Sequence, residues 1–256
     1  MRIITCANLK GGEGKTTLAR HIAYHAASKG FKTLAIDLDP QANLTDSLLP
    51  DATRERYTSS VSLFDARFSH AKWNLAESDD RLWLLPADPR LDALAEVAGD
   101  RASFVHRVRL HIRGLPGFDV IVIDTPTNAP ICYLSGLAAA DGVVSPVQMD
   151  AYGLSGAVRL TQAIQRVRAH YNPALVHIGF VVNRFNSRAG SHNELLAHFR
   201  TKQLRLLPTV LRERVAVQDS LGRRTPVWRG PRGRVNTRAA REMRAMCVEV
   251  LAGVGL

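Results

Sequence analysis

A glycine-rich loop near the start of the chain most constrains the possible fold. It follows an apolar run, residues 3–7, and precedes a segment with helical periodicity. Glycines let backbone N–H groups approach phosphate oxygens, and a helix that begins at the loop adds the positive end of its dipole. The order strand, glycine loop, helix therefore predicts a phosphate-binding site. Its residues are Lys10, Gly11, Gly12, Glu13, Gly14, Lys15, Thr16 and Thr17.

The polar residues of this loop predict a nucleotide bound with magnesium. Lys15 is placed to reach the β- and γ-phosphates, and the Thr16 hydroxyl is a suitable ligand for Mg²⁺. The loop thus indicates a nucleotide with β- and γ-phosphates and Mg²⁺ as cofactors.

Carboxylates follow two further apolar strands. Residues 32–36 are followed by Asp37 and Asp39, and residues 120–123 by Asp124. Carboxyl ends of parallel strands meet at one edge of a sheet, so these side chains are expected near the phosphate loop, where they would serve the metal and an attacking water. Asp124 would hold Mg²⁺ through a water. A purely structural role for Asp37 and Asp39, as turn and cap residues, is the alternative.

One departure from the ordinary phosphate loop points to a family. The standard pattern has glycine at position 9, whereas this chain has Leu9 and then a second lysine, Lys10. In this it resembles the ParA/MinD group of deviant Walker ATPases. The resemblance implies that Lys10 reaches the partner's phosphates in a nucleotide-sandwich homodimer, that Asp39 helps polarise the hydrolytic water and that Asp37 lies near the metal.

The same resemblance suggests residues that contact the base. A strand over 175–182 ends at Asn183, the position at which the family's asparagine contacts adenine, and the backbone around Pro208 is a weaker second assignment. The alternative for Asn183 is a buried amide that bonds only its own backbone. Glu13 is unusual at its position, because a carboxylate beside a triphosphate is repelled unless it points outward or pairs with a cation.

Charge is distributed unevenly along the chain. Residues 1–128 hold 16 Lys+Arg and 16 Asp+Glu, whereas residues 129–256 hold 18 and 7, so the whole net charge of +11 lies in the second half. Residues 200–244 contain 13 basic and three acidic residues, which favours an anionic polymer or surface as partner over a merely solvated helical face. The resemblance implies sequence-independent DNA binding, for which the candidates are Arg188, Arg212, Arg214, Arg223 and Arg224.

Composition and the C-terminal segment limit the number of domains, the localisation and the mode of docking that we expect. The 256 residues, 46% hydrophobic and 22% charged, suit one α/β domain over 1–256 without a helix-turn-helix extension ahead of the first strand. No secretory or membrane-spanning segment is evident, so we expect a cytoplasmic protein, and the DNA binding that the resemblance implies would make it nucleoid-associated. Cys6, Cys132 and Cys247 are interpreted as reduced core thiols. The helix expected over 236–251 carries an apolar stripe, interpreted as docking on the sheet rather than on a membrane.

The resemblance spans nearly the whole chain. It implies a doubly wound, mostly parallel sheet flanked by helices and an ATPase that forms an ATP-dependent dimer, binds DNA and segregates it with a centromere-binding, ParB-like partner. A MinD-like or cargo-positioning ATPase acting on a membrane or a protein assembly is the alternative. A further alternative is a metal-cluster carrier related to the nitrogenase iron protein. That chemistry needs paired thiolates, and the sequence offers no second suitable cysteine besides Cys132.

Overall fold

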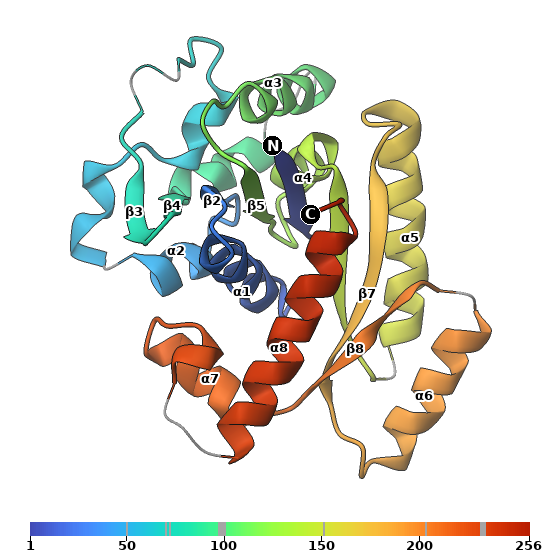
Figure 1. The fold of residues 1–256 in the computed structure, drawn as a ribbon. Helices are drawn as coiled ribbons and strands as arrows, with labels where there is room; N and C mark the ends of the chain where they lie inside the picture. The colour runs from blue at the N-terminus through green and yellow to red at the C-terminus, as the bar shows by residue number, and fades with distance from the viewer. Residues whose placement is uncertain are drawn as a thin grey trace.

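The central sheet contains strands from the whole length of the chain (Figure 1). The structure, a computed structural model, describes residues 1–49, 51–69, 71, 73–96, 101–150, 152–202, 204–230 and 234–256. In the described part the strand order is β3-β4-β2-β5-β1-β6-β7-β8; β3 pairs antiparallel with β4, and the other neighbours are parallel. The strands are β1 (Arg2–Cys6), β2 (Thr33–Asp37), β3 (Ala76–Asp79), β4 (Leu82–Leu85), β5 (Val120–Asp124), β6 (Gly142–Gln148), β7 (Val176–Phe185) and β8 (Leu206–Arg212).

Helices cover both faces of the sheet. The apolar residues of α1, α2, α7 and α8 pack in one core cluster, and those of α3, α4, α5 and α6 pack in the other. Figure 1 shows α1 and α8 side by side across the first face. The α-helices are α1 (Lys15–Ser28), α2 (Asn43–Leu48), α3 (Arg101–Arg113), α4 (Pro130–Ala139), α5 (Gly153–His170), α6 (Gly190–Thr201), α7 (Val215–Gly222) and α8 (Arg234–Ala252). Short 3₁₀ turns are η1 (Asp51–Arg56), η2 (Ser60–Phe64), η4 (Pro89–Glu96) and η5 (Val227–Arg229).

The two core clusters explain why the central strands are apolar without alternation. Ile3 contributes to one cluster and its neighbour Ile4 to the other, and Ile121 and Val122 of β5 divide in the same way. All four side chains are fully buried. A parallel strand covered on both faces needs apolar residues at every position. The prediction of a doubly wound, mostly parallel sheet is confirmed.

The last helix and the cysteines lie as the sequence indicated. Met243, Met246 and Val250 of α8 are buried against the sheet, so this stripe is a docking face. All three cysteines are buried and free, and burial raises the pKa of Cys132 to about 12, which leaves its thiol protonated. Among the described helices, none has the length and apolar content that crossing a bilayer requires.

Candidate nucleotide site

The phosphate loop joins β1 to α1 at the carboxyl edge of the sheet. Gly12 and Gly14 adopt φ of 76° and 106°, a left-handed conformation that favours glycine. No side chain caps the start of α1, which begins at Lys15, so its first N–H groups remain available. The loop thus has the free donors that bind phosphate oxygens.

The cationic and hydroxyl side chains of the loop contact the opposite wall. Lys15 Nζ donates to Thr127 Oγ1 at 2.8 Å, and Thr16 Oγ1 donates to Asp124 Oδ2 at 2.6 Å. Asp124 Oδ1 is buried and has no hydrogen-bond partner among the described residues. The Thr16 hydroxyl and the Asp124 carboxylate together fit a hydrated Mg²⁺, which Thr16 would ligate directly and Asp124 through a water. The ion would neutralise phosphate charge.

Two buried carboxylates lie side by side at the carboxyl ends of β2 and β5. Asp37 of β2 is in register with Asp124 of β5, and both are fully buried. Burial raises the pKa of Asp37 to about 6, although hydrogen bonds from Thr45 oppose the rise. Burial, together with repulsion from Asp37, raises the pKa of Asp124 well above its usual range. Mutual repulsion of this kind is what a divalent cation relieves.

The two acids predicted on β2 have different surroundings. The Asp37 carboxylate accepts the Thr45 N–H at 2.8 Å and the Thr45 hydroxyl at 2.7 Å, so it holds the start of α2. Asp39 instead lines the cleft, and its Oδ1 accepts a local hydrogen bond from the Gln41 N–H at 3.0 Å. Asp39 can therefore reach a water in the cleft, whereas a metal role for Asp37 stays a prediction.

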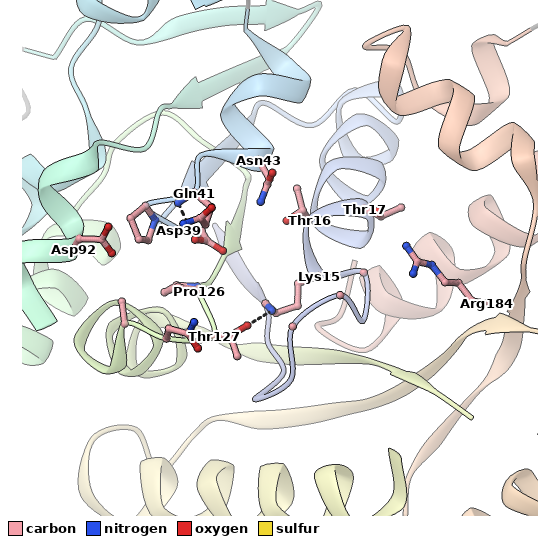
Figure 2. Close-up of a pocket in the computed structure, with 16 residues that line it drawn as sticks. Lys15, Thr16, Thr17, Asp39, Gln41, Asn43, Asp92, Pro126, Thr127 and Arg184 are labelled. Carbon is pink, nitrogen blue, oxygen red and sulfur yellow. Dashed lines mark hydrogen bonds between the residues drawn. The ribbon is translucent and has the colours of Figure 1, made fainter. Parts of the chain in front are cut away.

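A cleft of about 540 Å³ lies between the loop and the carboxyl ends of β2 and β5. Figure 2 shows Lys15 and Thr127 meeting at its base, Asp39 and Asp92 on one side, and Arg184 on the other. The sequence did not predict Asp92 and Arg184 as cleft residues, because both are distant in the sequence from the phosphate loop and the folded chain brings η4 and the end of β7 to the cleft. The available signal for Arg184 was its position directly after Asn183 in the sequence; in the structure it adopts a φ of 51°.

The candidate base-binding residues do not all meet at the loop. Asn183 Nδ2 donates to the backbone oxygen of Glu13 at 2.7 Å, so this side chain supports the phosphate loop and does not bond only its own backbone. Asn183 also lines a smaller pocket with Arg212 and Glu213. Pro208 lies inside β8 and lines neither of these two pockets, so its contact with the base stays a prediction.

Four of the five candidate DNA-binding arginines, Arg188, Arg212, Arg223 and Arg224, are exposed. Arg214 differs, because its side chain is 13% exposed and donates from Nε and Nη2 to Glu242 at 3.1 and 2.6 Å. Within the basic segment 200–244, Arg232 lies outside the described residues.

Comparison with known proteins agrees with this geometry. The family model described as "AAA domain" matches residues 1–177. The chain is 35% identical to the chromosome-partitioning ATPase Soj of Thermus thermophilus over 79% of this chain and 78% of that protein.

Solved structures share the fold. Cobyrinic acid a,c-diamide synthase from Mycobacterium smegmatis, with bound ATP analogue and magnesium, is 26% identical with a TM-score of 0.76, covering 97% of this chain and 93% of that one. A variant of Cyanothece McdA in complex with ATP is 21% identical with a TM-score of 0.82, covering 100% and 97%. The chain therefore belongs to the ParA-type P-loop ATPases, enzymes that bind ATP with Mg²⁺ and hydrolyse it.

Proposed function

We propose that this ATPase is a DNA-partition switch. Bound ATP stabilises a sandwich dimer in which Lys10 of each subunit reaches the other's phosphates, and the dimer binds DNA without sequence preference. Hydrolysis, stimulated by a ParB-like partner bound to a centromere, returns the chain to the free state. The enzyme acts in the cytoplasm on the nucleoid, and hydrolysis resets a two-state equilibrium.

One observation supports this function above the others: exposed arginines emerge where β7 and β8 end beside the nucleotide site. Arg188 follows β7 by three residues, and Arg212 ends β8 and lines the pocket shared with Asn183. A nucleotide that orders these strand ends would order the arginines with them. Arginine binds phosphate in a bidentate manner, and a dimer presents each arginine twice.

The test is binding to random-sequence duplex DNA without nucleotide, with ADP and with ATP, over a salt series. Tight, salt-sensitive binding with ATP alone is expected, and six to ten phosphate contacts correspond to a loss of roughly 10³- to 10⁵-fold between 50 and 200 mM salt. Absence of binding at saturating ATP would refute the partition function, and membranes and protein cargo would then be tested in its place.

A pair of variants separates specific arginines from total charge. Arg188→Ala with Arg223→Ala should weaken binding and reduce the salt slope by about one for each phosphate that is no longer bound. Arg67→Ala with Arg159→Ala removes the same charge from exposed positions elsewhere and should leave the slope unchanged. Equal effects of both pairs would mean that DNA binding follows net charge and not this surface.

A further inference from the structure

The carboxylate that interrupts the phosphate loop points away from the cleft. The Glu13 side chain is 1% exposed, and Glu13 is not among the residues that line the cleft. Its Oε2 accepts the Gln148 N–H at 2.6 Å, and the Gln148 side chain returns to the loop by donating to Gly12 O at 2.8 Å. Glu13 is thus fixed against the carboxyl end of β6, on the outer side of the loop.

The other Glu13 oxygen meets Lys10. Glu13 Oε1 forms an ion pair with Lys10 Nζ at 2.8 Å, and among the described residues it has no partner besides Lys10. Lys10 Nζ also donates to Asp150, which follows β6. The Lys10 N–H is held as well, by Asn8 Oδ1 at 2.9 Å. Hydrogen bonds from Lys10 to Asp150 and Glu13 raise the pKa of the Lys10 ammonium. In the free chain Lys10 is therefore bound to carboxylates of its own subunit.

We propose that Glu13 is a positioning residue that holds Lys10 within its own subunit and so raises the ATP concentration needed to form the dimer. The proposal rests on the proposed function, in which Lys10 enters the partner's site. When Lys10 leaves, Glu13 Oε1 stays buried without a partner and bears the desolvation penalty of an unpaired charge. A small or apolar residue at position 13 would impose no such penalty.

The direction of the effect follows from charge. Lys10 exchanges two carboxylates for the phosphates of the partner's nucleotide, and a triphosphate offers it more negative charge than a diphosphate. Asp150 is 39% exposed, so water solvates it after Lys10 leaves, whereas Glu13 at 1% gains no such solvation. Release of Lys10 therefore costs more free energy at Glu13 than at Asp150.

The test compares Glu13→Gln, which is close in shape and uncharged, with Asp150→Asn and with the exposed control Asp80→Asn. The first measurement is the rate of reductive methylation of Lys10 in the nucleotide-free chain, read by mass spectrometry. Loss of either carboxylate lowers the Lys10 pKa and should speed labelling in both variants, while the control labels as wild type does. This measurement does not depend on dimer formation.

The second measurement is the ATP concentration for half-maximal dimer formation, followed by light scattering. Glu13→Gln should lower it about tenfold, the factor that corresponds to one charge-assisted hydrogen bond, and Asp150→Asn by less. Equal ATP concentrations for wild type and Glu13→Gln would refute the role of Glu13 and leave the dimer intact. A wild-type chain that stays monomeric at saturating ATP would instead refute the sandwich dimer, and this role of Glu13 with it.

Discussion

Replacing Arg214 should destabilise the fold before it affects any ligand. Arg214 lies just after β8 and Glu242 on α8, and their paired side chains are 13% and 20% exposed. Breaking a buried ion pair by removing one partner costs about 3–5 kcal/mol. Glu242 stays partly compensated in the variant, because the Arg212 N–H donates to its Oε2 at 3.3 Å and Arg212 Nη1 lies 3.8 Å from its Oε1. We therefore expect Arg214→Ala to lower the free energy of unfolding by about 2 kcal/mol, or Tm by roughly 4–8 °C.

Urea unfolding of a double-mutant cycle with Glu242→Gln measures the pair, and coupling of about 2 kcal/mol is expected. Arg188→Ala is the control, because that side chain is exposed; its effect should stay within about 0.5 kcal/mol. Arg214→Ala as stable as wild type would refute the structural role of the pair. A loss of DNA binding in Arg214→Ala is therefore interpretable only at temperatures at which the variant is folded.

Two further predictions concern the loop and the helix that follows it. His21 is fully buried, its Nδ1 donates to Thr17 O and its Nε2 accepts the Val227 N–H, and burial lowers its pKa to about 3. The stability that the neutral His21 contributes is complete above the unfolded pKa of about 6.5 and is lost as pH falls below it. Between about pH 7.5 and 5, the free energy of unfolding in urea should fall by about 2 kcal/mol more in wild type than in His21→Gln. Parallel pH dependences of the two proteins would contradict this. Gly14→Ala would strain a φ of 106° and bring a Cβ against Asn183 Nδ2, so calorimetry should show ATP binding at least about tenfold weaker, and wild-type affinity would contradict the geometry.

The parts of the fold that local patterns determine could be predicted from the sequence. The phosphate loop, the acids after β2 and β5 and the apolar strands all depend on residues adjacent in the chain, and the structure has each of them. Segment ends follow local patterns less closely: β7 continues to Phe185, beyond the predicted end at residue 182. An apolar pattern stops at the first polar side chain, whereas backbone pairing with β6 and β8 continues past it.

Contacts between distant residues could not be predicted. The orientation of Glu13 depends on Gln148, 135 residues later, and Arg214 meets Glu242 across 28 residues. Neither pairing leaves a local pattern, because a charged residue next to a loop is compatible with an outward, inward or paired side chain. The position of Pro208 could not be predicted for the same reason, because the length of β8 and its register with β7 decide which of its residues line a pocket.

The central place of β1 also determines when this chain can fold during synthesis. β1 is made first, yet its two neighbours are β5 and β6, which begin at Val120 and Gly142. At about 5–20 residues per second, the ribosome needs roughly 7–30 s to complete them. Throughout that interval Ile3 and Ile4 have no strand beside them. The nucleotide site is therefore assembled late around the first strand of the sheet to be made, and the speed of translation determines how long this apolar strand stays open to aggregation or to a chaperone.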